Sequence, residues 1–310
     1  MSRIRYSMKQ SYAETRWMPV RLRGFVDLVR PFTLIAPFLG CVLGILAATG
    51  ATGQTAPWTD ILYAAITLAM VNAASNALNQ ASDVASDTIS KPYRPIPQGI
   101  ITAEEARFVA YTLYALALFR SGTISEWFAV LMLAIVVTTI FYNMEPVRFK
   151  RRGWWANVAI AVPRGMLGFV AAWSIVADPV DALPWVLGAL MMVYLIGAQN
   201  SKDYSDVLGD KAAGIITPVI RYGPEKTAWY SLPFLLIPGI LTTYLGSIRF
   251  IPEAGMYLGA LILFCGAMTA HLMINHRRQN FQKLENSPSW AMMYLTLLVM
   301  MLGFAIMYWA

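Results

Sequence analysis

The sequence predicts an all-α, polytopic membrane protein. Hydrophobic residues make up 57% of its 310 residues and charged residues only 13%, whereas soluble domains typically carry about 25% charged residues. Several uninterrupted apolar stretches reach about 20 residues, the length that an α-helix needs to cross a bilayer. A membrane β-barrel would instead require short segments in which polar and apolar residues alternate. The long continuous runs therefore favour a bundle of helices.

Nine apolar segments follow one another along the chain, and each is predicted to form one membrane-spanning helix. A loop rich in proline and glycine separates the second segment from the third, because such residues break helices. The third begins at Thr102, which forms a capping-box pattern with Glu105. The fifth is interrupted in its interior by Pro163 and Arg164. The predicted spans cover residues 32–49, 61–81, 102–119, 127–142, 154–176, 183–199, 227–245, 254–273 and 289–309.

Basic residues are distributed unevenly among the connections between these spans. The N-terminal segment, residues 1–30, and the loops after spans two, four, six and eight hold almost all of the lysines and arginines. By the positive-inside rule these segments lie in the cytoplasm, so residues 1–30 form a cytoplasmic or interfacial segment. The sequence therefore predicts a multi-pass protein of the cell inner membrane. Its net charge of +7 reflects this topology, and no nucleic-acid partner is expected.

A first acidic motif ends the second predicted span. Asn79, Asp83 and Asp87 follow one another at intervals of four residues, so on a helix they form one polar stripe. Two carboxylates one turn apart repel each other unless a cation lies between them. Because the motif offers only oxygen ligands, the expected cation is Mg²⁺, which often binds one or two carboxylates together with phosphate oxygens. Lys91 and Arg94 follow at once and can neutralise such a phosphate.

A second acidic motif ends the sixth predicted span. Asp206 and Asp210 repeat the four-residue spacing, and Asp203 adds a third carboxylate. The chain has only 17 acidic residues, and five of them lie in these two short motifs. An interval of four spans preserves the direction of the helix. Both motifs are therefore predicted at the cytoplasmic face, where they can share one cavity between two halves of the bundle.

Two acidic motifs among lysines and arginines suit a diphosphate bridged by Mg²⁺ ions, which stabilise the charge that develops as the diphosphate leaves. The apolar helices beneath them suit a long hydrocarbon tail. A molecule that combines this head with this tail is an isoprenyl diphosphate. Its ionisation would leave an allylic carbocation, which aromatic faces can stabilise. These features point to a prenyl diphosphate as the substrate.

The same residues resemble the motifs of the UbiA superfamily of intramembrane prenyltransferases. Residues 79–87 and 91–99 resemble its first motif, and residues 202–214 resemble its second. Residues 142–150 resemble the connection after its fourth helix, and Arg30 with Pro31 resembles the dipeptide that often opens its first helix. One position departs from the pattern, because Gln80 stands where members often have aspartate. A neutral amide cannot supply charge to a metal, so Gln80 is left out of the metal site.

The resemblance implies a single domain, residues 1–310, in which nine transmembrane helices surround a central cavity capped by cytoplasmic loops. It implies Mg²⁺-dependent transfer of an isoprenyl group from a prenyl diphosphate to a lipophilic or aromatic acceptor, amid membrane lipids. The residues that it assigns to the metal are Asn79, Asp83, Asp87, Asp203, Asp206 and Asp210. Those that it assigns to the diphosphate are Arg30, Asn79, Lys91, Arg94, Arg148, Lys150 and Lys202. The catalytic set that it implies is Asp83, Asp87, Asp206, Asp210 and Tyr142.

Several alternatives stay open at this stage. The resemblance does not specify the acceptor, which could belong to lipid, quinone or tetrapyrrole biosynthesis. A terpene cyclase of the same superfamily would use the same metal site and quench the cation internally. A membrane transporter would also contain intramembrane acids and internal repeats. Arg164 lies at membrane depth, where its charge is equally compatible with a cavity function and with a structural ion pair.

Overall fold

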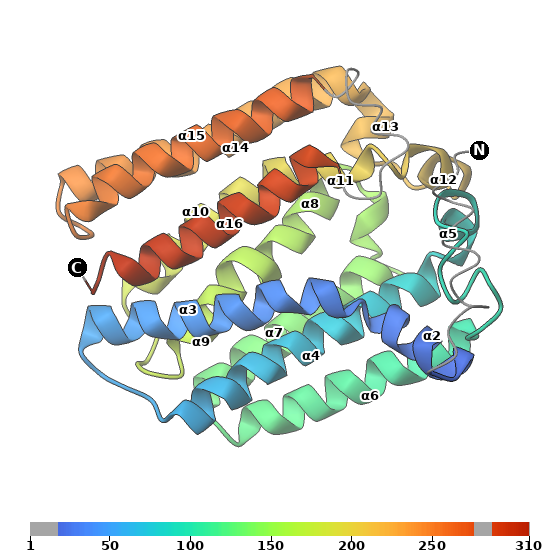
Figure 1. Cartoon of the computed structure of the whole chain (residues 1–310), viewed down its shortest axis with the longest axis horizontal. Coiled ribbons are helices and arrows are strands. Elements are labelled where there is room, and N and C mark those ends of the chain that lie inside the picture. Colours follow the sequence, from blue (N-terminus) through green and yellow to red (C-terminus); the bar gives the residue numbers. More distant parts are fainter. Residues whose placement is uncertain (1–17, 276–286, 310) are drawn as a thin grey trace.

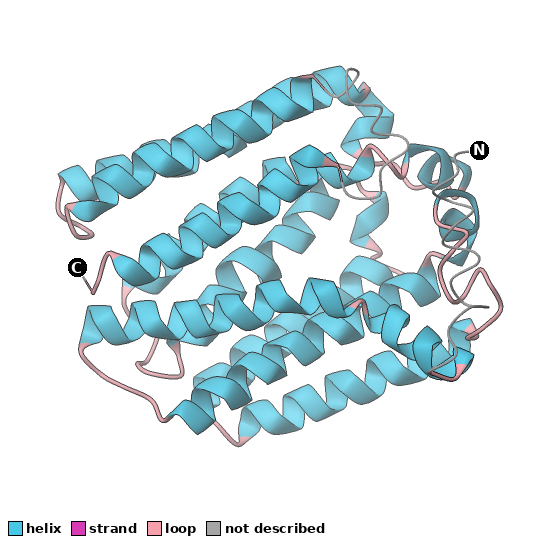
Figure 2. Ribbon diagram, in the orientation of Figure 1, coloured by secondary structure: helices cyan, strands magenta, loops and turns pink. Residues whose placement is uncertain are grey.

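The computed structural model describes residues 18–275 and 287–309, and every regular element in these ranges is a helix (Figure 1 and Figure 2). The predicted all-α class is therefore confirmed. The fifth predicted span consists of α8 (Trp154–Ala161), the π-helix η3 (Val162–Leu167) and α9 (Gly168–Trp173). The other long helices are α3 (Ile35–Thr52), α4 (Trp58–Ser82), α6 (Ala103–Gly122), α7 (Glu126–Asn143), α10 (Ala182–Ala198), α14 (Pro224–Ser247), α15 (Ala254–Ile274) and α16 (Pro288–Ile306).

Eight helical segments among the described residues are long and apolar enough to cross a membrane, and they coincide with eight of the nine predicted spans. The ninth is α6, which carries charged residues such as Glu104 and Arg120 in its end turns. It begins at the predicted capping box, in which Glu105 N donates a hydrogen bond of 3.1 Å to Thr102 Oγ1. Because α6 packs along α4, it belongs to the bundle even though its composition is less apolar (Figure 1).

The core of the bundle falls into two clusters. One is built mainly from α10, α14, α15 and α16, and the other mainly from α3, α4, α6 and α7. The span that contains η3 contributes to both, with Trp173 in the first cluster and Val170 in the second. This span therefore runs through the middle of the molecule, between the two halves (Figure 1).

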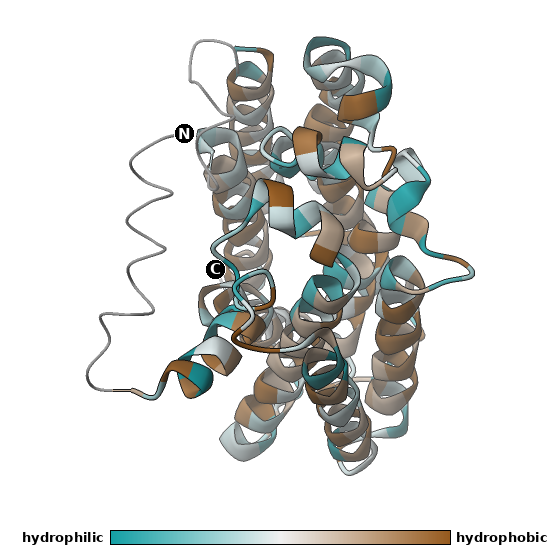
Figure 3. Ribbon diagram, turned by 90° about the vertical axis from the view of Figure 1, so that its right-hand side faces the viewer, coloured by the Kyte–Doolittle hydropathy of each residue, from teal (hydrophilic) through white to brown (hydrophobic). Residues whose placement is uncertain are grey.

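Short helices close one end of the bundle. They are α5 (Val84–Ser90), the 3₁₀-helix η2 (Phe149–Arg151), α11 (Asn200–Asp203), α12 (Val207–Ala212) and α13 (Pro218–Tyr222). Figure 1 shows α5 and α12 next to each other, and Figure 3 looks onto this end, where hydrophilic residues lie among the short helices. Both acidic motifs lie here, which confirms that they reach the same face of the bundle.

At the N-terminus, α2 (Val20–Val29) leads through Arg30 and the 3₁₀-helix η1 (Pro31–Leu34) into α3. Two side chains of α4 fix α2 in place. Gln80 Nε2 donates a hydrogen bond of 2.8 Å to Leu28 O, and Asn76 Nδ2 donates one of 2.9 Å to Val29 O. The predicted segment 1–30 is described only from residue 18 onward. Residues 1–17, and the predicted basic loop at 276–286, lie outside the described residues.

We predict that the end that carries the motifs faces the cytoplasm, because the basic loops gather there. Thr88→Cys and Lys211→Cys are exposed at that end and should react with an impermeant maleimide only from the cytoplasmic side. Gln54→Cys, in the loop at the other end, should react only from the opposite side. The native Cys41 and Cys265 are buried and set the background. Labelling of Thr88→Cys from outside would contradict this orientation.

Candidate functional site

The first acidic motif spans a break between two helices. α4 ends at Ser82, and Asp83 has non-helical backbone angles of φ −108° and ψ 17° before α5 begins. The prediction of one helical stripe through Asn79, Asp83 and Asp87 is therefore wrong. The reason is tertiary, because the chain turns at Asp83 and α5 packs against α12 instead of extending α4. The three side chains nevertheless line one cavity.

The second motif repeats this arrangement. After α10 and α11 the helix is interrupted, and Asp206 immediately precedes α12. Asp206 thus corresponds to Asp83, and Asp210 corresponds to Asp87 in the first turn of the following short helix. In both motifs the N–H of the second aspartate donates to the carbonyl oxygen of the first, at 2.8 Å for Asp87 and 2.9 Å for Asp210. The sequence repeat is therefore also a structural repeat.

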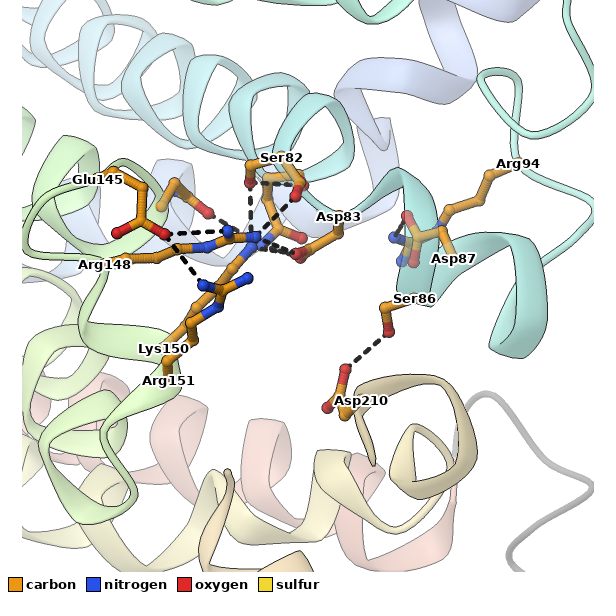
Figure 4. A network of polar contacts seen from close by, with 12 residues as sticks. Ser82, Asp83, Ser86, Asp87, Arg94, Glu145, Arg148, Lys150, Arg151 and Asp210 are labelled. Atoms are coloured by element: carbon orange, nitrogen blue, oxygen red, sulfur yellow. Dashed lines mark hydrogen bonds and ion pairs between the residues drawn. The ribbon is translucent and has the colours of Figure 1, made fainter. Parts of the chain in front are cut away.

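The two motifs meet where α5 packs against α12. Gly209 N donates a hydrogen bond of 3.0 Å to Ser90 Oγ. A Cβ atom on Gly209 would overlap with Ser86 O and Ser90 Oγ, so the absence of a side chain allows this close approach. Ser86 Oγ in turn donates a hydrogen bond of 2.8 Å to Asp210 Oδ1 (Figure 4). Backbone contact between the helices thus brings the carboxylates of both motifs to one place.

Two buried ion pairs strengthen this contact. Lys91 Nζ lies 2.6 Å from Asp206 Oδ2 and links the loop after the first motif to the second motif. Arg94 Nη1 lies 2.6 Å from Asp87 Oδ2, with both side chains at most 7% exposed. Breaking a buried pair by removing one partner leaves an uncompensated charge, which typically costs about 3–5 kcal/mol. Each pair therefore holds its loop firmly at the site.

Asp83 is held from three directions. Lys150 Nζ contacts Asp83 Oδ1 and donates a hydrogen bond of 3.0 Å to Ser82 Oγ (Figure 4). Arg148 Nη2 lies 4.0 Å from the same carboxylate oxygen. Asn79 Nδ2 donates a hydrogen bond of 2.9 Å to Asp83 Oδ2. Because these partners come from α4 and from the connection after α7, the carboxylate is fixed where those elements meet.

These side chains surround a polar cavity at the capped end. All predicted site residues line it except Arg30 and Arg148. Polar residues that the sequence did not single out also line it, among them Ser86, Asn157 and Gln199. Ser86 and Gln199 lie within or beside the motifs, whereas only the fold brings Asn157 of α8 to the site. The predicted residues in the lining are Asn79, Asp83, Asp87, Lys91, Arg94, Tyr142, Lys150, Lys202, Asp203, Asp206 and Asp210.

Three residues of the sequence motifs lie outside the cavity lining. Arg30 occupies the break between α2 and η1, with a positive φ of 55°. Arg148 Nη2 donates a hydrogen bond of 2.9 Å to Ser82 O and so supports the end of α4. Gln80 is 2% exposed and holds α2 through Leu28 O. An amide at this position therefore does not weaken the charge of the site.

The two aspartates of the second motif differ in their electrostatic surroundings. Burial raises the pKa of Asp206, but the charges of Lys91, Lys202 and Arg94 outweigh burial, and its pKa lies below the usual value. Asp210 forms no ion pair with any described residue. Burial and the nearby charge of Asp206 raise its pKa to about 6. Asp210 is thus a carboxylate whose charge is poorly compensated without a ligand.

A second, mainly apolar chamber lies in the middle of the bundle. It is lined by side chains of α3, α4, α7, η3, α9, α10 and α16, such as Val71, Phe169 and Met191. Gln199, just after α10, lines both this chamber and the polar cavity. Its side chain is 3% exposed, and its Nε2 has no hydrogen-bond partner among the described residues. The two spaces therefore adjoin at a buried amide donor.

The acidic residues of the polar cavity offer oxygen ligands for a metal ion. In residues 18–275 and 287–309, no three His, Cys, Asp or Glu side chains gather closely enough to form a metal-binding group. Three of the carboxylates are instead held by their own bases, as described above. The donor set still fits Mg²⁺, which prefers carboxylate and amide oxygens. The raised pKa of Asp210 also marks a crowded negative charge that a cation would relieve.

The long apolar helices of this fold define a class of protein, an integral multi-pass membrane protein. The model of the UbiA prenyltransferase family matches residues 38–298. Because this match covers most of the chain, the protein belongs to the UbiA prenyltransferase family and is a membrane prenyltransferase. Membership in a family of transferases removes the transporter alternative.

Individual relatives agree with this assignment. The chain is 31% identical over 212 residues to the digeranylgeranylglyceryl phosphate synthase of Methanoregula boonei, across 67% of this chain and 71% of that protein. It is 26% identical over 212 residues to the bacteriochlorophyll synthase 33 kDa chain of Rhodobacter capsulatus, across 66% and 69%. The structure of a UbiA homologue from Archaeoglobus fulgidus bound to GPP and Mg²⁺ shares the fold, with a TM-score of 0.72, 22% identity and coverage of 92% and 98%.

We predict opposite effects of two neutral substitutions on the stability of the ligand-free protein at pH 7. Asp210→Asn removes a poorly compensated charge and should raise the melting temperature by about 2–5 °C. Asp206→Asn leaves Lys91 buried without its counter-ion and should lower the melting temperature. Thermal unfolding of the purified protein measures both changes. Equal shifts in the same direction would contradict the difference between the two carboxylates.

The pH dependence of stability provides the control for this prediction. The pKa of Asp210 is raised from 3.8 to about 6 in the folded protein, so the folded state binds more protons than the unfolded state between those values. The stability of the wild type should therefore fall as the pH rises through this window. In Asp210→Asn, the part of this decrease in stability that is due to Asp210 should be absent. Identical pH profiles would show that Asp210 is not the titrating group.

A further prediction concerns the contact between α5 and α12. Gly209→Ala should force the two helices apart, because its Cβ would overlap with Ser86 and Ser90. We expect a loss of stability of about 1–3 kcal/mol and a loss of prenyl transfer, although no charge changes. Gly122→Ala is the matched control, since a Cβ there meets no atom within 4 Å. Normal transfer by Gly209→Ala would show that this packing does not align the motifs.

Proposed function

We propose that this protein transfers an isoprenyl group from a prenyl diphosphate to a lipophilic or aromatic acceptor within the membrane and releases diphosphate, with Mg²⁺ as cofactor. The observation that carries the proposal is that a charged cavity and an apolar chamber adjoin at Gln199, which lines both. A prenyl diphosphate divides in the same way, into a charged head and a hydrocarbon tail. The homologue of the same fold from Archaeoglobus fulgidus was solved with GPP and Mg²⁺, which supports this choice of donor.

The bases of the polar cavity supply the contacts for the diphosphate. Lys91, Arg94 and Lys150 line the cavity, and without a donor each is paired with a carboxylate. Donor binding would exchange these partners, because the bases would turn to phosphate oxygens and leave the carboxylates to a cation. The exchange keeps the buried charges compensated in both states, which a buried site requires. Lys202 lines the same cavity and adds a fourth base.

The acidic residues would hold the cofactor at this site. When bound, Mg²⁺ supplies Lewis-acid stabilisation of the departing diphosphate. Gln199 Nε2, which lacks a partner, can donate a hydrogen bond to the head of the donor. Tyr142 lines the polar cavity and can present its aromatic face to the allylic cation. The residues that would hold the metal are Asn79, Asp83, Asp87, Asp203, Asp206 and Asp210.

The reaction breaks the bond between C1 of the prenyl chain and a diphosphate oxygen, and the electron pair leaves with the diphosphate. A nucleophilic oxygen or carbon of the acceptor then forms a bond to C1, and the acceptor loses one proton. The apolar lining of the chamber restricts water, which would otherwise capture the cation. The chain's own residues thus bind the head, enclose the tail and protect the intermediate.

The acceptor and the side of the membrane are also part of this proposal. The relatives include digeranylgeranylglyceryl phosphate synthases and a bacteriochlorophyll synthase. We infer an acceptor from lipid, quinone or tetrapyrrole biosynthesis that enters from the surrounding lipid. The basic loops near the motifs favour a site that opens to the cytoplasm at the inner membrane.

We predict that Asp83→Asn and Asp206→Asn each reduce transfer by more than about 100-fold per folded molecule, since even outer-shell partners of a metal contribute about 10- to 100-fold. Asp60→Asn, at the other end of α4, is the matched control and should change transfer little. Mass spectrometry of products from geranylgeranyl diphosphate, Mg²⁺ and a panel of acceptors measures transfer. Chelation of Mg²⁺ should abolish it.

Two outcomes of this experiment would count against the proposal. Near-normal transfer by either variant would refute a site shared by the two motifs. A cyclic hydrocarbon formed in the absence of any acceptor would show that the enzyme is a terpene cyclase, which quenches the cation internally.

A further inference from the structure

Arg164 lies in the interior of the fifth span, where a cation is costly unless an anion faces it. At a rise of 1.5 Å per residue, it lies about 15 Å from the start of the span. It belongs to η3, the π-helical turn between α8 and α9. Such turns inside α-helices frequently occur at functional sites.

The guanidinium of Arg164 faces the apolar chamber without a counter-ion. No other charged residue lines that chamber in the part of the chain that the structure describes. The side chain is exposed, and it forms neither an ion pair nor a hydrogen bond with any described residue. Arg120 on α6 shows the contrast, because it donates hydrogen bonds to Thr67 Oγ1 and Tyr63 O at 3.0 and 3.1 Å. The described residues therefore offer Arg164 no structural ion pair.

The backbone that carries Arg164 is packed tightly against α10. A Cβ atom on Gly165 would lie 2.6 Å from Met192 N, and one on Gly188 would lie 2.9 Å from Met166 O. These two glycines therefore let η3 and α10 pack backbone to backbone. A guanidinium on a turn that is fixed in this way is pre-organised to bind a ligand in the chamber.

Arg164 acts close to the junction of the two cavities. It lines the chamber together with Gln199, which also lines the polar cavity. Arg164 does not itself line that cavity, which already contains four bases for the diphosphate. With the donor placed as proposed above, C1 lies at the junction, and the nucleophile of the acceptor has to reach it there. Arg164 lies on the chamber side of this junction and is therefore placed to contact an acceptor that approaches C1.

An uncompensated guanidinium at this position would oppose the reaction. It would repel the allylic cation as that cation forms at C1, and the low dielectric constant of the bundle interior makes such a repulsion strong. An anion bound to Arg164 would cancel the repulsion. The described lining of the chamber contains no carboxylate that could serve, so the anion has to arrive with a substrate.

We propose that Arg164 binds a single anionic group of the acceptor, a phosphate or a carboxylate, and so selects acceptors that carry one. Guanidinium groups bind both anions through paired, charge-assisted hydrogen bonds. This inference rests on the proposed function and adds to it the chemical class of the acceptor. It makes Arg164 a specificity-determining residue that acts from the chamber side of the junction.

The test compares two pairs of acceptors with the purified full-length protein, geranylgeranyl diphosphate and Mg²⁺. One pair is a polyprenylglycerol phosphate and its dephosphorylated alcohol, and the other is a hydroxyaryl carboxylic acid and its methyl ester. In the wild type, the anionic member of one pair should have a KM lower by about 10- to 100-fold, the value of a charge-assisted hydrogen bond. The pair that shows this difference identifies the anion as a phosphate or a carboxylate.

Variants test whether Arg164 causes this difference in KM between anionic and neutral acceptors. Arg164→Gln should remove the difference, while the KM of the donor changes by less than about threefold. Arg164→Lys should keep part of it, because lysine retains the charge but not the planar fork. Arg249→Gln, an exposed arginine paired with Glu253, is the matched control and should keep the whole difference. A higher melting temperature with a non-hydrolysable donor analogue and Mg²⁺ shows that each variant is folded.

The outcomes separate this inference from the proposed function. Equal KM values for anionic and neutral acceptors in the wild type would overturn the inference alone. A higher donor KM in Arg164→Gln with unchanged acceptor discrimination would also overturn it, because Arg164 would then bind the diphosphate. The absence of diphosphate release with every acceptor would overturn the proposed function instead. If Arg164→Gln does not fold, the wild type and Arg164→Lys still decide the question.

Discussion

The close packing of α5 against α12 is the contact on which the rest of the site depends. Each of these short helices carries the last aspartate of one acidic motif, and each begins directly after the preceding aspartate, Asp83 or Asp206. Gly209 lets the two backbones approach, and Lys91 reaches across to Asp206 at 2.6 Å. Without this contact, the carboxylates of the two halves of the bundle would belong to separate surfaces. With it, they line one cavity.

A cavity of this kind raises a problem of charge. Five aspartates and four bases line the same small space, and burial penalises each of their charges. In the ligand-free protein the problem is solved by direct pairing, as between Arg94 and Asp87. The pairing leaves Asp210 poorly compensated, which its raised pKa reflects. An anionic head that arrives with cations replaces one compensated arrangement by another, so the same residues serve the empty and the proposed bound state.

The polar cavity and the apolar chamber lie at different depths of the bundle. Charges gather at the capped end, whereas the middle of the bundle offers an apolar chamber with Arg164 as its one charged lining residue among those described. The two spaces meet at Gln199, whose buried amide marks the boundary. In the proposed function, this division orients the prenyl diphosphate with its head at the cap and its tail among the helices. The π-helical turn of η3 carries that arginine, which we propose binds the acceptor.

The sequence by itself determined the class of protein, the positions of the spans and most of the residues of the polar cavity. Hydropathy is a local and additive property, so summing it along a window locates the spans. The acidic motifs can be recognised because their aspartates repeat at a spacing of four residues. Only the tertiary structure decided that the helices break at Asp83 and Asp206, because those breaks serve the packing of α5 on α12. It also placed Gln80 against α2, left Arg30 outside the cavity lining, and directed Arg164 into the chamber. Those outcomes depend on which backbone a side chain meets across the bundle, and such contacts join residues that are distant in the sequence.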